Sequence, residues 1–427
     1  MLLEFKVRNF RSIKDWQNFS MLAESKIKEH ENNVITLDNY HVLSTSLIYG
    51  RNASGKSNLL NAFKALQYLV FESGDFKLDK KIPAFEPFKL DSRYSKDPTE
   101  FYIDFIADDN IRYIYEIGFN NTEIEYEILK FYPKTQPATL FERIKNKPIK
   151  YGEYLTGRKK DIEEKLYNNQ LFLSKVGVEK LEALTSPYKF FSRGLFVSNF
   201  HDSKYDELLI QIYTNRIAND NLPFFKENMN ILMKEADTGI ERIEVTEEDI
   251  DVDLLPKEMS DEKKEELVEK YKRKIRTIHK FFDGDKEVGT VDFKLDEEST
   301  GTIKLLAMGG LILEALADGQ VLIIDELDKS LHPKLTKVLI EIFHSKKTNP
   351  KNAQLIFATH DISLLNNELF RRDQVWFAEK EYEGCSHYYS ISDIPGVRAN
   401  APFEKYYMSG RLGATPVINK NELNFQF

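Results

Sequence analysis

The stretch GRNASGKS, residues 50–57, constrains the fold of this chain more than any other. It follows the apolar run TSLIYG and precedes KSNLLNAFKALQYLVF, in which apolar residues recur at helical spacing. The motif GxxxxGKS thus lies between an expected strand and an expected helix, where backbone N–H groups can wrap a phosphate. The predicted ATP-binding residues here are Gly50, Arg51, Asn52, Ala53, Ser54, Gly55, Lys56, Ser57 and Asn58. The competing interpretation is a glycine turn that merely precedes a helix.

Two residues of this loop have the side chains that phosphate chemistry requires. Lys56 is placed to reach the β and γ phosphates, and Ser57 is placed to ligate Mg²⁺. The cofactors predicted from the loop are therefore ATP and Mg²⁺.

A second motif, VLIIDELD, places two acids at the end of an aliphatic strand. Asp325 is suited to hold Mg²⁺, directly or through water, and Glu326 to polarise the attacking water. The alternative is a strand that ends in an acidic turn. One helix and one strand later, LIFATHD places His360 at a strand end, where it can hydrogen-bond the γ-phosphate. We therefore predict Glu326 and His360 as catalytic residues and Asp325, with Ser57, as metal ligands.

Hydrophobic patterning predicts an α/β fold. The opening LLEFKVRNF alternates apolar and charged residues, and EFYIDFIA, RYIYEIGF and EIEYEILKFY continue as an antiparallel meander. Strands and helices alternate again near the end, which indicates a parallel core. We expect an N-terminal ATPase lobe at 1–132, a mainly helical insertion at 133–287 and a C-terminal ATPase lobe at 288–427.

The clearest helix expected in the insertion is SDEKKEELVEKYKRKIRTIHKFF. Ser260 would be its N-cap, with acids in the first turns and bases in the last. Its apolar stripe would be Leu267, Tyr271, Ile275, Ile278 and Phe282.

Composition limits the partners and the compartment. With 60 Lys and Arg against 69 Asp and Glu, the net charge is −9, so nucleic acid must be bound by a local basic patch. A basic cluster with two tyrosines is the candidate patch, and a solvated face is the plainer interpretation. It comprises Arg143, Lys145, Lys147, Lys150, Arg158, Lys159 and Lys160, with Tyr151 and Tyr154.

The chain reads as cytoplasmic and without a membrane span. Its single cysteine, Cys385, fits a reducing compartment, and the charged N-terminus does not resemble a signal peptide. The apolar region 305–324 is interrupted by Glu314, Asp318 and three glycines.

The order of these motifs resembles that of the ABC-type ATPases, a superfamily that includes the SMC and RecF proteins. In these enzymes a signature peptide near LSGGQ lies upstream of the acidic strand and completes the nucleotide site of a second subunit. ESTGT, residues 298–302, stands at that position. Ser299 matches the signature serine and Gly301 its second glycine, while Thr300 replaces the first. The resemblance thus implies that Ser299 and Gly301 bind the ATP of another copy.

A closer resemblance is to RloA-like ABC/AAA-type ATPases, which are associated with abortive infection and phage defence. It rests on VRNFRSIKD, YIYEIGFNNTEIEYEIL, ESTGTIKLL, DELDKSLHP and the ending YYMSGRLGATPVI. By this match KSLHP is the D-loop, with Ser330 and His332 at the dimer contact. The region IPAFEPFKLDS, where a Gln loop is expected, contains no glutamine. By analogy with SMC-like heads, Arg8, Asn9 and Arg11 would lie near the adenine or the phosphates. The plainer interpretation is that they are ordinary surface residues.

The resemblance implies an ATP-driven switch in a phage-defence system. The ATPase would form a homodimer or higher oligomer and work with a separately encoded effector, such as a RloB-like or Toprim nuclease. The alternative is a RecF/SMC-like ATPase that clamps DNA in repair or chromosome maintenance, and direct nucleic-acid contact is possible in either case. An autonomous nuclease of the OLD type is disfavoured because residues 361–427 leave no room for a nuclease domain. A scaffold that binds ATP without hydrolysing it ranks last.

Overall fold

The computed structural model describes residues 1–415 apart from 38, 178, 180, 200–202, 220–222, 237, 250–255, 257 and 258. These residues form two compact units. Unit 1 consists of Met1–Ser198, Asp318–Leu327 and Ile340–Phe427, and unit 2 of Asn199–Ala317 and Asp328–Leu339. Each unit is described by itself.

Unit 1 contains an antiparallel sheet built from the alternating segments of the sequence. Its strand order is β10 (Lys150–Tyr151), β9 (Ala138–Ile144), β8 (Ile124–Phe131), β7 (Arg112–Phe119), β6 (Thr99–Ile106), β1 (Leu2–Arg8) and β2 (Gln17–Ser20). In β1 the apolar residues are buried and the charged ones are partly exposed, as the period-two pattern predicts. The predicted meander is confirmed by the pairing of β6 with β7 and of β7 with β8.

The second sheet of unit 1 is mainly parallel. Its order is β11 (Leu195–Asn199), β15 (Val321–Asp325), β16 (Gln354–Ala358), β5 (Thr45–Tyr49), β17 (Val375–Lys380) and β18 (Ser386–Ser390). Strands β15, β16, β5 and β17 run parallel, and β18 pairs antiparallel with β17. Every residue of β5, β15 and β16 is buried, as expected for a parallel core covered on both faces.

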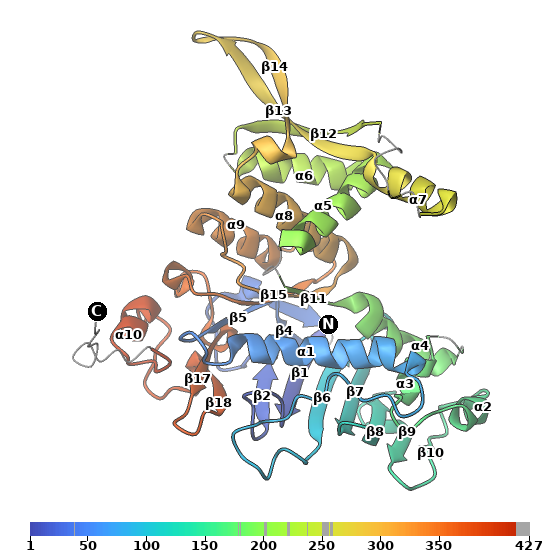
Figure 1. Cartoon of the computed structure of the whole chain (residues 1–427). Helices are drawn as coiled ribbons and strands as arrows, with labels where there is room; N and C mark the ends of the chain where they lie inside the picture. Colours follow the sequence, from blue (N-terminus) through green and yellow to red (C-terminus); the bar gives the residue numbers. More distant parts are fainter. Residues whose placement is uncertain are drawn as a thin grey trace, which may run out of the picture. The chain divides into compact units, whose positions relative to one another are not determined.

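Helix α1 (Lys56–Glu72) joins these sheets into one core, because its apolar residues belong to the same buried cluster as residues from both. The ring of Phe63 stacks on Phe5 of β1 with a centroid distance of 3.8 Å. Figure 1 shows α1 lying across β1, β6 and β7. The remaining elements of unit 1 are β3 (Val34–Leu37), β4 (Tyr40–Leu43), α2 (Lys159–Glu164), α3 (Phe172–Lys175), α4 (Glu182–Lys189) and α10 (Phe403–Met408). The α/β class, with an antiparallel meander and a parallel P-loop core, is confirmed.

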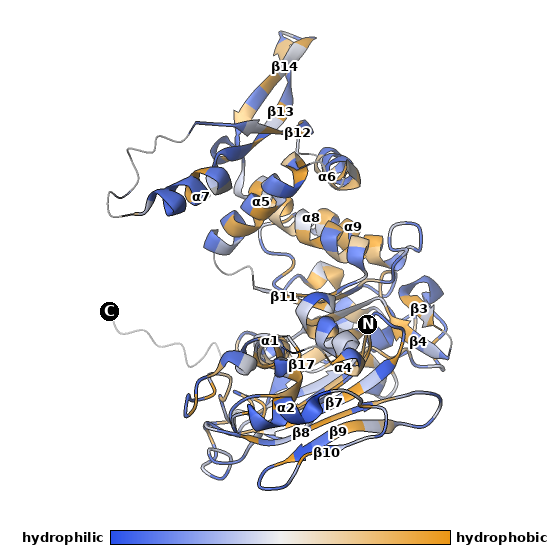
Figure 2. Ribbon diagram, turned by 90° about the vertical axis from the view of Figure 1, so that its right-hand side faces the viewer, coloured by the Kyte–Doolittle hydropathy of each residue, from blue (hydrophilic) through white to orange (hydrophobic). Residues whose placement is uncertain are grey.

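Unit 2 combines helices with a small sheet. Its elements are α5 (Ser203–Ala218), α6 (Pro223–Glu235), β12 (Ile240–Glu247), α7 (Asp261–Tyr271), β13 (Arg273–Asp283), β14 (Lys286–Lys294) and α8 (Thr300–Asp318), and α9 (Pro333–His344) begins in it. Figure 2 shows α8 as apolar and α7 as hydrophilic. Two glycines let neighbouring helices approach α8, since a Cβ on Gly309 would lie 2.5 Å from Leu232 and one on Gly310 2.3 Å from Tyr213.

Helix α8 is long and apolar enough to cross a membrane by length and composition, and 67% of the window concerned is buried. Its two internal charges are paired with α5. Lys304 lies 3.0 Å from Asp206, and Glu314 lies 2.9 Å from Arg216. Burial and charge pairing are typical of a core helix.

The helix expected from Ser260 to Phe282 is wrong in its second half. Helix α7 ends at Tyr271, and the chain continues as β13, the central strand of the sheet β12–β13–β14. The segment RKIRTIHKFF is rich in β-branched and aromatic residues, and pairing on both sides satisfies its backbone. The expected insertion at 133–287 also differs from unit 2, because β9 and β10 belong to the first sheet and unit 2 begins at Asn199.

Unit 1 contains a partly buried histidine whose protonation should destabilise the fold. His344 Nε2 lies 2.8 Å from Thr45 Oγ1, and burial, with a smaller effect from His30, lowers the pKa of His344 from 6.5 to about 3. As the pH falls, His344 takes up a proton in the unfolded chain before it does so in the folded chain. The stability that neutral His344 contributes is therefore fully present above about pH 6.5. It is lost as the pH falls toward 3.

Between pH 7 and pH 5 the wild type should therefore lose about 2 kcal/mol more unfolding free energy than the variant His344→Gln. Urea unfolding of both proteins at the two pH values measures this difference. Equal pH dependence of the two proteins would contradict the prediction.

Candidate nucleotide-binding site

Three neighbouring parallel strands of unit 1 carry the motifs found in the sequence. Strand β5 leads into the phosphate loop, β16 into His360, and β15 ends at Asp325 with Glu326 next. Register places Ile48 opposite Ala358 and Phe357 opposite Ile324. Because parallel strands end at the same edge of a sheet, the three motifs meet there, as ligand sites in such sheets do.

Two crowded glycines shape the phosphate loop. Gly50 has φ 151°, and a Cβ on it would lie 2.3 Å from the carbonyl oxygen of Ala378. Gly55 has φ 111°, and a Cβ on it would lie 2.2 Å from Ser386 Oγ. Gly55, the N-cap of α1, has no side chain that could cap the helix. A helix start of this kind is suited to bind a phosphate.

Buried polar side chains in the loop fit an anionic ligand. Lys56, only 5% exposed, donates from Nζ to the carbonyl oxygen of Gly50 at 2.8 Å. Ser54 Oγ is buried without a hydrogen-bond partner in the described structure. Unsatisfied buried polar atoms are uncommon in folded proteins and are typical of ligand sites. A glycine cradle, a lysine and an orphaned hydroxyl together suit a polyphosphate.

Strand β18 holds the loop from outside, and sequence analysis did not predict this. Ser386 Oγ donates to the carbonyl oxygen of Ser54 at 2.6 Å, and Tyr388 Oη donates to that of Gly55 at 2.7 Å. Ser12 Oγ lies 2.7 Å from Ser386 Oγ and accepts a hydrogen bond from Asn58 Nδ2, also at 2.7 Å. These contacts hold the carbonyls of Ser54 and Gly55 outside the loop, away from the side on which a ligand would bind. Burial raises the pKa of the Tyr388 hydroxyl, which therefore remains a donor at neutral pH.

The acidic pair adopts two different environments. Asp325 is the last residue of the buried strand β15 and is 5% exposed. Glu326 turns out of the strand with φ 56°, a left-handed conformation that is uncommon outside glycine and clusters at functional sites. The N–H of Leu327 then donates to the carbonyl oxygen of Ala358 at 3.3 Å. Asp325 is thus buried within the strand, whereas Glu326 lies in the turn that follows it and is partly exposed.

A metal at this edge would take its remaining ligands from a bound nucleotide. Among the described residues, no group of three or more His, Cys, Asp or Glu is placed to hold a metal. Ser57 and Asp325 offer two oxygen ligands, and Mg²⁺ is commonly held by one or two protein ligands with phosphates and water.

A cavity of about 960 Å³ opens beside the phosphate loop. One wall is the first half of the loop, with His360, and another is the C-terminal tail from Tyr407 to Gly410. The tail is fixed to the loop because the N–H of Arg51 donates to the carbonyl oxygen of Ala414 at 3.1 Å. The quoted tail YYMSGRLGATPVI thus forms part of the site, although residues 416–418 lie outside the described chain.

The predicted signature and D-loop residues lie in unit 2. Ser299 and Thr300 are exposed at the start of α8. Gly301 adjoins the D-loop, since a Cβ on it would lie 3.0 Å from the carbonyl oxygen of Ser330. Ser330 itself has φ 65°. His332 precedes α9 and accepts a hydrogen bond at Nδ1 from the N–H of Lys334 at 3.2 Å. Signature and D-loop therefore form one surface of unit 2.

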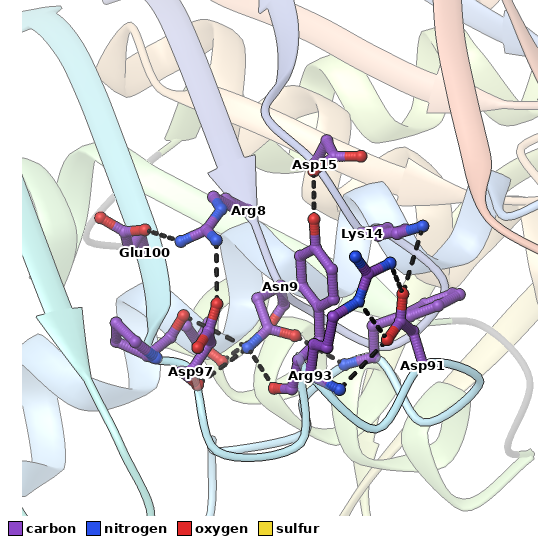
Figure 3. Close-up of polar contacts among 12 residues, drawn as sticks. Arg8, Asn9, Lys14, Asp15, Asp91, Arg93, Asp97 and Glu100 are labelled. Atoms are coloured by element: carbon purple, nitrogen blue, oxygen red, sulfur yellow. Dashed lines mark hydrogen bonds and ion pairs between the residues drawn. The ribbon is translucent and has the colours of Figure 1, made fainter.

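The motif VRNFRSIKD holds a loop in place. Asn9, fully buried with φ 53°, donates from Nδ2 to the carbonyl oxygens of Tyr94 and Asp97 at 2.9 and 2.8 Å. Arg8 pairs with Asp97 and Glu100, as Figure 3 shows. Arg11 forms two hydrogen bonds with Glu86 at 2.8 and 3.0 Å. These side chains anchor residues 86–100, which accounts for them without a ligand.

Three of the seven cations of the basic cluster are paired with carboxylates of the protein itself. Arg143 is buried and donates to the carbonyl oxygen of Gln170 at 2.5 Å. Lys145 lies 2.7 Å from Glu123 and 3.1 Å from Glu125, and Lys150 lies 3.0 Å from Glu142. Lys159 lies over the Tyr151 ring at 5.0 Å. These pairs lower the number of charges in the cluster that could release counterions from a nucleic acid, and Lys147, Arg158 and Lys160 remain exposed.

Comparison with known proteins gives one family match. The family described as "AAA domain, putative AbiEii toxin, Type IV TA system" matches residues 46–366, which include the phosphate loop, residues 298–302, the acidic pair and His360. A search of curated proteins gives no match.

Solved structures with similar folds include an SMC head bound to the C-winged helix domain of ScpA, which is 12% identical. The alignment covers 91% of this chain and 97% of the SMC head chain, with a TM-score of 0.43. The recombination mediator RecF with ATP is 15% identical. The alignment covers 91% of this chain and 97% of the RecF chain, with a TM-score of 0.37. RecF with ATPrS is 16% identical. That alignment covers 91% of this chain and 98% of the RecF chain, with a TM-score of 0.37.

The contact from β18 gives a direct test of the loop geometry. Tyr388→Phe removes the hydrogen bond to the carbonyl oxygen of Gly55 and should weaken binding of a non-hydrolysable ATP analogue about 3- to 10-fold. Isothermal titration calorimetry measures this affinity. The control is Tyr382→Phe, whose side chain is fully exposed and should bind as the wild type does. Wild-type affinity in Tyr388→Phe would show that β18 does not shape the loop.

Proposed function

The chain belongs to this AAA-domain family, and on that premise we propose that it is an ATPase that acts as a nucleotide-driven dimerisation switch. The observation that carries the proposal is the meeting of the phosphate loop, the acidic pair and His360 at one edge of the parallel sheet. A nucleotide triphosphate, a metal and a water each have matching groups there.

Binding would use the loop and the start of α1. The N–H groups of residues 52–57 would surround the β-phosphate, and Lys56 would exchange its contact with Gly50 for phosphate oxygens. Ser57 and Asp325 would hold Mg²⁺, which neutralises charge on the β and γ phosphates when bound.

Hydrolysis would use residues that follow β15 and β16. Glu326 would orient the attacking water and accept its proton, which requires a carboxylate directed away from the metal ligand Asp325. His360 lines the cavity beside the loop and would hydrogen-bond the γ-phosphate. Loss of the γ-phosphate would remove these contacts.

A second copy of the chain would complete the site. Ser299 and Gly301 lie at an exposed helix start that adjoins the D-loop, a surface suited to a phosphate presented from outside. Ser330 and His332 would contact the other copy. ATP bound between two copies would favour the closed pair, and hydrolysis would release it, because the ligand contacts both copies only in the closed state.

We assign the switch to a cytoplasmic anti-phage defence system of the RloA-like kind. The resemblance of five separate motifs supports this, as does the toxin named in the family description. The effector would be a separately encoded nuclease, RloB-like or of Toprim type. The alternative, a RecF/SMC-like DNA clamp, is weakened because Arg143, Lys145 and Lys150 of the basic cluster are paired within the protein.

Removing the acid of Glu326 should separate binding from turnover. Glu326→Gln should reduce ATP hydrolysis at least about 100-fold and accumulate an ATP-bound dimer, because the water lacks a proton acceptor. Phosphate release and light scattering with ATP measure the two effects. The exposed Glu368 of the same unit provides the control, since Glu368→Gln should behave as the wild type. Unchanged turnover in Glu326→Gln would exclude the proposed catalytic role.

The dimer trapped by Glu326→Gln should retain the effector. We expect a nuclease to co-purify with this variant from the native host. The nuclease should not co-purify with Lys56→Ala, which should fail to bind ATP. Mass spectrometry identifies the protein, and cleavage assays test its activity. If nothing is retained and the purified chain binds duplex DNA in a salt-sensitive manner, the DNA-clamp alternative replaces the defence assignment.

A further inference from the structure

The side chain of the residue before the predicted signature serine is a carboxylate largely shielded from solvent and held by two donors. The Glu298 side chain is 8% exposed. His279 Nε2 donates to its Oε1 at 2.7 Å, and Thr277 Oγ1 donates a short hydrogen bond to the same oxygen. A carboxylate buried to this extent is stable only when such donors satisfy it.

Both donors belong to β13, the central strand of the sheet in unit 2. Thr277 and His279 are two residues apart and therefore share one face of the strand. Thr277 is fully buried, and the His279 ring packs on Phe293 of β14 with a centroid distance of 4.7 Å. The anchor of Glu298 is thus a strand hydrogen-bonded on both sides.

Ser299 is fixed from the other direction by helix α8. Its Oγ accepts a hydrogen bond from the N–H of Thr302 at 3.1 Å and lies 2.9 Å from Thr302 Oγ1. The carbonyl oxygen of Ser299 accepts the first helical bond, from the N–H of Ile303 at 3.0 Å. The signature serine therefore lies between two anchors, the helix on one side and Glu298 on the other.

The charge of Glu298 makes its orientation important. A carboxylate free to turn toward an incoming γ-phosphate would repel it, because like charges a few ångströms apart cost energy in a site with little water. The two donors on β13 hold this charge within unit 2. The helix N-terminus is then left to attract the phosphate.

We propose that Glu298 is a positioning residue for the signature half-site. Thr277 and His279 hold Glu298, which thereby positions Ser299 and Gly301 for the ATP of the second copy. The same two contacts keep the charge of Glu298 away from that ATP. The proposal rests on the proposed function, since it concerns the same composite site.

Substitutions at both ends of the anchor test its role. Glu298→Ala should lower kcat for ATP at least about 10-fold while the affinity of the isolated chain for ATP stays within about 2-fold. Glu298→Gln keeps an acceptor for Thr277 and should retain most of the activity. Thr277→Ser keeps the hydroxyl and should be active, whereas Thr277→Val removes it and should resemble Glu298→Ala. Equal kcat in Glu298→Ala and the wild type would overturn the proposal.

Mixing experiments separate a role in the second copy's site from a general structural defect. Lys56→Ala is inactive alone but supplies an intact signature to its partner. Mixed with Glu298→Ala, it forms one complete site, from the loop of Glu298→Ala and the signature of Lys56→Ala, so turnover should rise several-fold above either variant alone. If turnover does not recover, Glu298 acts in the site of its own subunit or in folding, and the proposal is overturned.

A reference mixture distinguishes failure of the proposal from failure of the proposed function. Ser299→Trp blocks the signature directly and should also be rescued by Lys56→Ala. If Ser299→Trp is rescued and Glu298→Ala is not, the composite site stands and the role of Glu298 is excluded. If Ser299→Trp alone hydrolyses ATP at the wild-type rate, the composite site itself is excluded, and the proposal for Glu298 with it.

Discussion

The turn from β5 into α1 is the constraint on which the rest of the structure depends. To point N–H groups inward, the loop turns its carbonyls outward, and those carbonyls need donors of their own. Residues more than 300 positions later in the chain supply them, since Ser386 and Tyr388 donate to Ser54 and Gly55. The same contacts leave no space for a Cβ at Gly55. The phosphate loop therefore acquires its shape only when the two ends of unit 1 have come together, so the site and the fold form as one.

The chain passes between the two units at four points, one of which closely follows the acidic pair. Unit 1 gives way to unit 2 after Leu327, and on either side of this point Glu326 and Ser330 adopt left-handed backbone conformations. Each such residue costs about 1 kcal/mol or more, so the surrounding structure must hold it. The segment between them joins the proposed catalytic acid to the D-loop that adjoins Gly301. In the proposed switch, the water-activating residue and the dimer surface would thus be joined by only a few residues of strained chain, which would suit coupling to hydrolysis.

Local patterns predicted the parts of the fold whose stability is local. The spacing around Lys56, the alternation in β1 and β6 to β8, and the aliphatic strands before Asp325 and His360 all appear in the structure as expected. The segment after Tyr271 did not follow, because its charges fit a helix while its isoleucines and phenylalanines gain more from pairing with β12 and β14. The contacts of Ser386, Tyr388 and the C-terminal tail had no local signal, since they depend on which distant strand adjoins β5.

Polar residues near the site divide into those that face a ligand and those that hold the groups that do. Asn9 belongs to the second kind, because its side-chain amide is used by the loop it anchors and its carbonyl oxygen accepts from Thr99 Oγ1. Glu298 belongs with it, since both donors to its carboxylate lie on β13. Lys56 differs, because its present acceptor is the carbonyl oxygen of the loop that it would leave for a phosphate. A buried polar group whose partners lie on a neighbouring strand or loop therefore indicates positioning. One whose partner is the binding loop itself can exchange that partner for a ligand, and Ser54 Oγ is a further candidate contact because it lies in the loop.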